Sequence, residues 1–278
     1  MHWQTTRFRI DLSRPQVMGI VNLTPDSFSD GGRHADARAA LAHCERLIEE
    51  GADILDLGAE STRPGTAPVS LEDERVRLLP VLREALKLGV PVSVDTYKPA
   101  LMQEVLALGA DIVNDIWALR QPGGIDAVAA HGACGVCLMH MHGQPRTMQL
   151  APLEGDPLPP VRALLQQSTD ALVARGVARE RICWDPGIGF GKTAAQNFAL
   201  LARQGELLGS GHPLLAGWSR KSSLGAVTGL PVQERLVPSV AAALLAVERG
   251  AHIVRVHDVR ETVSALKVLQ ALRANAAL

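Results

Sequence analysis

Two sets of side chains in this sequence have the chemistry to bind different parts of one small molecule. Oxygens that accept hydrogen bonds are offered by Asp95, Asn114 and Asp185. Such carboxylates and amides suit a flat heterocycle that carries several N–H donors and one carbonyl acceptor. Positive charge is offered by Arg63, Lys221, Arg255 and His257. Cations suit phosphate, and a guanidinium grips two of its oxygens at once.

Asn22 adds a neutral oxygen ligand to these two sets. A ligand of this kind helps to hold a Mg²⁺ ion that is bound chiefly by the phosphates of a substrate. The residues together predict a site that takes a heterocycle at one end and a diphosphate at the other.

These residues stand at or just after the ends of short apolar runs. Eight runs occur, at 17–21, 53–58, 91–95, 111–116, 135–140, 181–185, 213–218 and 252–257. They are almost continuously apolar, as expected of parallel strands that are covered on both faces. Segments with helical periodicity lie between them, at 36–50, 71–88, 100–108, 125–131, 161–175, 195–208, 239–249 and 262–274. The alternation predicts an α/β fold, a single-domain (β/α)₈ TIM barrel over residues 1–278, with an open doubly wound sheet as the alternative.

In such a barrel the active site lies at the carboxyl ends of the strands. A lone Asp or Asn at a strand end also serves simply to cap the following helix. Polar residues end nearly every strand in this sequence, and capping alone explains that poorly. We therefore expect the two sets to meet at one mouth of the barrel.

The stretch WDPGIGFGKT, residues 184–193, comes within one residue of the phosphate-binding P-loop pattern. Pro186 stands where the loop must begin. Proline has no N–H to offer to a phosphate, so the anion cradle would lack a member. The stretch is therefore not predicted to bind ATP.

Composition favours small-molecule chemistry. The 28 Lys and Arg residues nearly balance the 29 Asp and Glu residues, which gives no electrostatic reason to expect nucleic acid or an anionic membrane. No apolar window reaches the roughly 20 residues of a membrane span, and the protein is predicted to be cytoplasmic. The four cysteines are too few and too scattered for a disulfide scaffold, and we expect core cysteines, including the Cys134–Cys137 pair.

Eight motifs, in order and one for each strand, resemble the dihydropteroate synthase family. They are MGIVNLTPDSFSDGG, LGAESTRPG, VSVDTYKP, VNDI, LMHMHGQPRTMQ, DPGIGFGK, GWSRKS and RVHDV. The resemblance runs from about residue 15 to the end of the chain. It implies a TIM barrel, usually a homodimer, that joins 6-hydroxymethyl-7,8-dihydropterin diphosphate to 4-aminobenzoate in a Mg²⁺-dependent reaction. This folate-pathway family is the target of sulfonamides.

The resemblance also implies roles for individual residues. Pterin contacts are expected from Asp95, Asn114, Asp185, Lys221, Ile116, Met139 and Phe190. Diphosphate contacts are expected from Asn22, which also binds the metal, and from Arg63, Arg255 and His257. The aminobenzoate pocket is expected from Thr62, Pro64, Phe190 and Ser222, with Phe28 from the first long loop. The groups expected to assist the chemistry are Lys221, Arg63, Arg255 and His257.

Leaving-group chemistry then predicts the mechanism. Once its charge is neutralised, diphosphate departs and leaves a carbocation on the pterin methylene, so no nucleophilic side chain is needed. The arylamine attacks that carbon. The stretches NLTPDSFSDGG and ESTRPGTAP are predicted to close over the site, with pterin binding before aminobenzoate.

Three other functions fit part of the pattern. A pterin-binding methyltransferase barrel would share the three acceptors but has no use for the phosphate-binding cations. A catalytically silent paralogue would bind pterin as a sensor or scaffold. A phosphate-sugar isomerase would want Glu60 as base and His140 as electrophile, and would leave the three acceptors idle.

Overall fold

Eight parallel strands form one sheet in the computed structural model, which describes residues 1–24, 33–61, 65–144 and 147–275. The strands follow the order β8-β7-β6-β5-β4-β3-β10-β9. A bridge between Trp184 and Leu214 joins the two outer strands, which brings the sheet round into a barrel. The predicted (β/α)₈ fold is confirmed, and the open doubly wound alternative is wrong.

The eight barrel strands coincide with the eight apolar runs. Their bounds are β3 Gln16–Asn22, β4 Ile54–Gly58, β5 Val92–Asp95, β6 Ile112–Asp115, β7 Gly135–Met139, β8 Ile182–Asp185, β9 Leu215–Ala216 and β10 Ile253–Val256. Nearly all of their residues are buried, because one face lines the barrel interior and the other packs on helices. Each strand ends at the same rim, where the polar residues follow it.

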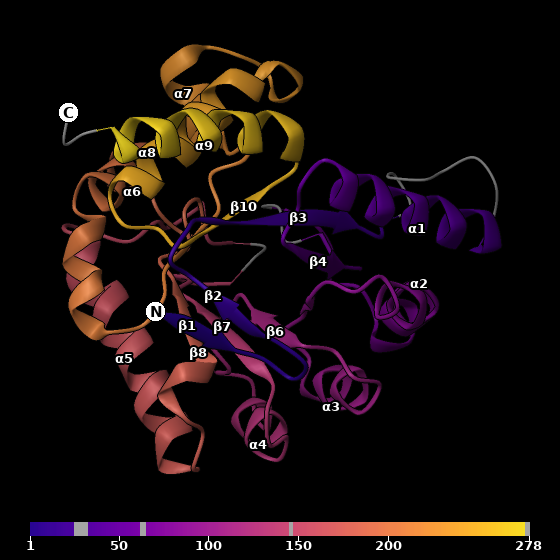
Figure 1. Ribbon diagram of the computed structural model, residues 1–278. Helices are drawn as coiled ribbons and strands as arrows, with labels where there is room; N and C mark the ends of the chain where they lie inside the picture. The colour runs from indigo at the N-terminus through magenta and orange to yellow at the C-terminus, as the bar shows by residue number, and fades with distance from the viewer. Residues whose placement is uncertain (25–32, 62–64, 145–146, 276–278) are drawn as a thin grey trace.

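Helices surround the strands as an outer ring (Figure 1). They are α1 Arg33–Glu49, α2 Leu71–Ala85, α3 Pro99–Ala107, α4 Gly124–Ala129, α5 Leu158–Ala174, α6 Ala194–Ala202, α7 Ser222–Thr228, α8 Leu236–Glu248 and α9 Val259–Ala274. Each crossover carries the chain back to the amino end of the next parallel strand. None of the helices in the described part of the chain is both long and apolar enough to cross a membrane.

Two helices differ from the sequence prediction. The segment predicted as one helix over 195–208 is α6 followed by a 3₁₀ helix, Gln204–Ser210. The two glycines of that 3₁₀ helix, Gly205 and Gly209, disfavour a continued α-helix. Helix α7 was not predicted, because its seven residues are too few to show a clear helical period. It begins directly after Lys221 and so takes part in shaping the site.

A β-hairpin that sequence periodicity missed closes the amino end of the barrel. Strands β1 His2–Gln4 and β2 Arg9–Asp11 pair antiparallel, and the hairpin lies across the centre of the helix ring (Figure 1). Trp3 is fully buried against the first residues of the barrel strands, and its indole N–H donates to the carbonyl of Arg181 at 2.9 Å. The only open mouth of the barrel among the described residues is therefore the carboxyl end.

The prediction of core cysteines is confirmed. All four cysteines are free and buried. Cys137 and Cys183 are register partners on β7 and β8 and pack in the barrel interior above the hairpin.

Candidate active site

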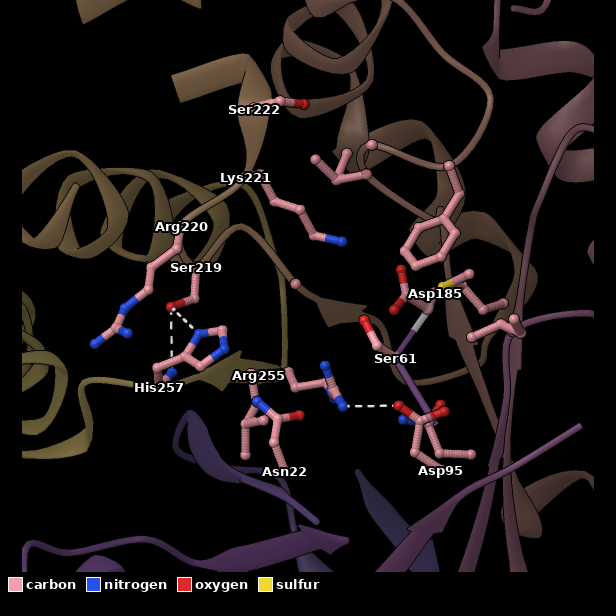
Figure 2. A pocket seen from close by; sticks show the side chains of 18 of the residues that line it. Asn22, Ser61, Asp95, Asp185, Ser219, Arg220, Lys221, Ser222, Arg255 and His257 are labelled. Atoms are coloured by element: carbon pink, nitrogen blue, oxygen red, sulfur yellow. Dashed lines mark hydrogen bonds and ion pairs between the residues drawn. The ribbon is translucent and has the colours of Figure 1, made fainter. Parts of the chain in front are cut away.

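The carboxyl mouth of the barrel holds a cavity of about 390 Å³. It is walled by eleven residues predicted from the sequence: Asn22, Asp95, Asn114, Ile116, Met139, Asp185, Phe190, Lys221, Ser222, Arg255 and His257. Figure 2 shows side chains of this cavity converging from several strand ends. The other predicted site residues, Phe28, Thr62, Arg63 and Pro64, lie outside the described residues.

The three hydrogen-bond acceptors stand at the ends of barrel strands. Asp95 and Asn114 are register partners at the ends of β5 and β6, and Asp185 ends β8. The Oδ1 atom of Asp185 accepts the N–H of Gly187 at 2.7 Å, which fixes the rotation of the carboxylate. Burial raises the pKa of Asp185, and burial raises the pKa of Asp95 to about 7 despite a nearby guanidinium. Both carboxylates gain from a ligand that donates hydrogen bonds to them.

Arg255 connects the acceptors with the cationic side of the cavity. Its Nε donates to Asp56 at 2.6 Å. Its Nη2 donates to Asp95 at 2.8 Å, as Figure 2 shows. Burial opposes the charge on this guanidinium, but the two carboxylates raise the pKa of Arg255 above its ordinary value. Arg255 is therefore a permanent cation whose orientation two acids determine.

His257 is oriented by Ser219, which follows the end of the neighbouring strand β9. The Ser219 Oγ lies 2.9 Å from Nδ1 of His257 and accepts the backbone N–H of the same residue at 3.2 Å (Figure 2). The hydroxyl keeps one proton that it can donate to Nδ1 while it accepts that N–H. With the hydroxyl donating to Nδ1, a neutral imidazole carries its proton on Nε2, which is then a donor suited to an anion.

Lys221 extends into the cavity from the turn between β9 and α7 (Figure 2). Its Nζ lies 4.2 Å from the centroid of the Phe190 ring, a cation–π distance. The preceding residue, Arg220, has a left-handed φ of 58°. Ser239 accepts the N–H of Arg220 at 2.8 Å, and Asp258 pairs with its guanidinium at 2.6 Å. These contacts hold the unusual turn that aims Lys221 at the site.

The stretch that resembles a P-loop forms part of the wall of the cavity. Lys192 is only 2% exposed, and its amine donates to the carbonyls of Gly187, Phe190 and His140 at 2.8, 3.2 and 3.4 Å. Burial lowers the pKa of Lys192 to about 7. Gly187 has a φ of 69°, and a Cβ there would overlap the His140 carbonyl. The lysine holds a tight loop in place and is not directed at a phosphate.

Neither of the two residues that an isomerase would require is available for its role. The Glu60 carboxylate lines the cavity but already accepts hydrogen bonds from Tyr97 and Lys98. His140 is 3% exposed and stands apart from the residues that the structure shows around the cavity. Burial lowers the pKa of His140 to about 2.

Sequence reasoning missed several residues of this region, among them Met148 and Asp56. Met148 lines the cavity beside Met139, and it occurs in the quoted motif LMHMHGQPRTMQ without having been singled out. Asp56 lies beneath the cavity on β4 and contacts Arg255 and Asn114. An acid inside an otherwise apolar strand was the available signal, since a buried charge requires a partner.

Asn22, at the end of β3, is the residue predicted to bind a metal, and it lines the cavity together with His257. The described residues contain no group of three His, Cys, Asp or Glu side chains that could hold a metal ion on its own. One neutral amide oxygen fits a Mg²⁺ ion whose other ligands are substrate phosphates and water.

Comparison with known proteins identifies the family. A sequence profile described as "Pterin binding enzyme" matches residues 18–257. The chain is 50% identical over 279 residues to the dihydropteroate synthase of Neisseria meningitidis serogroup B, covering 98% of both chains.

Solved structures agree with this match. The dihydropteroate synthase of Yersinia pestis, in complex with a sulfonamide drug, is similar with a TM-score of 0.92 and 46% identity, over 99% of this chain and 100% of that one. The dihydropteroate synthase of Burkholderia cenocepacia, in complex with 7,8-dihydropteroate, is similar with a TM-score of 0.90 and 52% identity, over 99% and 97%. The chain therefore belongs to the dihydropteroate synthases, the family of pterin-binding transferases that its sequence motifs resemble.

Proposed function

We propose that the chain condenses 6-hydroxymethyl-7,8-dihydropterin diphosphate with 4-aminobenzoate, giving 7,8-dihydropteroate and diphosphate. One observation carries this proposal. The acceptors Asp95, Asn114 and Asp185 and the cations Lys221 and Arg255 wall a single cavity, so one ligand reaches both sets. The Burkholderia relative, whose structure holds 7,8-dihydropteroate, supports the same product for this chain.

The pterin ring is assigned to the acceptor side. A pterin carries N–H donors along one edge, and the carboxylates of Asp95 and Asp185 and the amide of Asn114 accept them. Ile116, Met139 and Phe190 are apolar and buried in one cluster, which suits the faces of a flat ring. The Lys221 amine lies over Phe190, the residue assigned to a face of the pterin, and is assigned to donate to the carbonyl oxygen of the pterin.

The diphosphate is assigned to the side of the cavity where Asn22, Arg255 and His257 stand, with Arg63 as a further predicted contact. Arg255 and the Nε2–H of His257 donate to the phosphate oxygens. Asn22 would hold Mg²⁺, which when bound supplies charge neutralisation to the departing diphosphate.

The chemistry requires orientation and charge rather than a nucleophilic side chain. The bond from the methylene carbon to the diphosphate oxygen breaks, and the electron pair leaves with the oxygen. The amine of 4-aminobenzoate then forms the new C–N bond and loses a proton. Holding the two reactants in line contributes on the order of 7–11 kcal/mol relative to free reactants.

The aminobenzoate is assigned to the rim formed by Ser222, Phe190 and Lys221, together with the predicted contacts Phe28, Thr62 and Pro64. The Ser222 hydroxyl and the Lys221 amine suit its carboxylate. Sulfonamide binding at this rim is proposed by analogy with the Yersinia relative.

We also propose a homodimer and a cytoplasmic location. The dimer is supported by an apolar row on the exposed side of α8, where Val237, Ala241 and Leu245 follow the i, i+4, i+8 spacing of one helix face. Size-exclusion chromatography with light scattering measures the assembly directly. A monomeric mass across the micromolar range would contradict the dimer.

The activity is tested by incubating the purified chain with the pterin diphosphate, 4-aminobenzoate and Mg²⁺. Dihydropteroate should form, and it should not form when the pterin lacks its diphosphate. Lys221→Met should lower kcat/KM by about tenfold or more, because charged hydrogen bonds contribute about 1.5–3 kcal/mol. Arg203→Ala is a matched control, because it removes a surface cation paired with Asp156 and Glu206, away from the cavity. Absence of dihydropteroate in the complete mixture would contradict the proposal.

A further inference from the structure

Asp56 is a buried acid that touches the site from beneath. It lies in the middle of β4, has no exposed surface, and is flanked in sequence by Leu55 and Leu57. Asp56 is not itself one of the described residues that line the cavity. A buried carboxylate is costly unless donors surround it, and this one faces two residues that do line the cavity.

The first of these residues is Asn114. Its Nδ2 lies 3.3 and 3.4 Å from the two carboxylate oxygens of Asp56. An ionised carboxylate accepts hydrogen bonds and donates none. Asn114 must therefore direct its NH₂ group toward Asp56, and its carbonyl oxygen is turned away from it. Asp56 thereby determines that Asn114 meets a ligand as an acceptor.

The second residue is Arg255. The Nε atom donates to Asp56 at 2.6 Å and the Nη2 atom donates to Asp95 at 2.8 Å. Two nitrogens of the guanidinium are thus fixed by hydrogen bonds. The Asp95 oxygen that faces the guanidinium already accepts one of these bonds. The orientation of the arginine and of a second acid depends on the same buried carboxylate.

We propose that Asp56 is a positioning residue, which sets the hydrogen-bond polarity of Asn114 and the orientation of Arg255 without touching the substrate. The proposal rests on the proposed function, because it takes the pterin as the ligand of this cavity. The contact between Asp56 and Asn114, residues on different strands, is the feature that carries it.

Asp56→Asn gives the first test. The introduced amide would keep its carbonyl oxygen on the Arg255 guanidinium and direct its NH₂ group at Asn114. The Asn114 amide would then turn its oxygen toward the NH₂ group at position 56 and present its own NH₂ group, a donor, to the cavity. Affinity for 6-hydroxymethylpterin, measured by isothermal titration calorimetry, should fall roughly 10- to 100-fold, the range expected when a hydrogen-bond acceptor is lost.

The reciprocal exchange gives the second test. In Asp56→Asn combined with Asn114→Asp, the carboxylate introduced on β6 accepts from the amide introduced on β4 and again offers an acceptor to the pterin. Asn114→Asp alone places two carboxylates in contact and should bind weakly. Adding Asp56→Asn to Asn114→Asp should therefore raise the affinity about tenfold. A second substitution improves binding in this way only if the two side chains are in direct contact. This comparison remains available if Asp56→Asn alone does not fold.

Asp111→Asn is the matched structural control. Asp111 is another fully buried acid with an arginine partner, Arg7, at 2.6 Å, but it lies near the opposite end of the barrel, just before β6. Its substitution should reduce stability and leave pterin affinity within about twofold.

The inference is overturned if Asp56→Asn binds pterin like the unaltered chain, or if it lowers affinity no more than Asp111→Asn does. It is also overturned if the exchange binds no better than Asn114→Asp alone. Failure of the unaltered chain to bind 6-hydroxymethylpterin would instead contradict the proposed function.

Discussion

Asp185→Asn should convert an acceptor of the pterin subsite into a donor. In the structure the Oδ1 atom accepts the N–H of Gly187 at 2.7 Å, and the other oxygen is the one left for a ligand. An asparagine keeps the bond to Gly187 only through its carbonyl oxygen. Its NH₂ group must then occupy the second position, where it would face a donor of the pterin ring.

The size of this effect follows from the bond that is lost. A hydrogen bond to a charged acceptor contributes about 1.5–3 kcal/mol. At about 1.4 kcal/mol per factor of ten, this predicts a dissociation constant about 10- to 150-fold higher for 6-hydroxymethylpterin. Folding should not suffer, because the Gly187 bond is kept and burial raises the pKa of Asp185, so a neutral side chain removes an unfavourable charge.

Calorimetric titration with 6-hydroxymethylpterin measures the affinity, and urea unfolding measures the stability of the same preparation. Weaker binding with unchanged or higher stability is expected. Affinity equal to that of the unaltered chain would refute the assignment of Asp185 to the pterin. Loss of binding accompanied by a loss of several kcal/mol in unfolding free energy would refute the argument from amide orientation.

Three further predictions follow from the geometry. Lys192→Met should lower the unfolding free energy by about 1–3 kcal/mol, because carbonyls bonded to the buried amine lose their donor; unchanged urea unfolding would contradict this. Because burial raises the pKa of Asp95 to about 7 and a pterin requires the ionised form, binding should release a proton and strengthen as the pH rises from about 6 to about 7.5. Calorimetry in buffers of different ionisation enthalpy detects this, and proton uptake would show that the sign is wrong. Aminobenzoate should bind more tightly when 6-hydroxymethylpterin, diphosphate and Mg²⁺ are present, and equal affinity without them would rule out the predicted order.

The barrel was predictable because its signal is local. Each strand is a short run of aliphatic residues, and a strand buried on both faces needs little else to be recognised. The hairpin of β1 and β2 carries no such signal. Its strands are three residues long and mostly polar, and they are defined by the contact of Trp3 with the far end of the barrel.

The candidate site was predictable because side chains at strand ends must meet at the rim of a closed barrel. The contacts between those side chains were not predictable. Asp56 and Arg255 are 199 positions apart, and their bond depends on the register of β4, β3 and β10 around the barrel. The role of Lys192 was hidden for a similar reason, since its partners are backbone carbonyls of a tightly folded loop.

A crystal structure of the chain with 6-hydroxymethylpterin and diphosphate tests the central claim most directly. The account predicts the donor edge of the ring within hydrogen-bond distance of Asp95, Asn114 and Asp185. It predicts the diphosphate in the same cavity, in contact with Arg255 and His257. A pterin bound elsewhere, or a diphosphate that no single ligand could join to the ring, would contradict it.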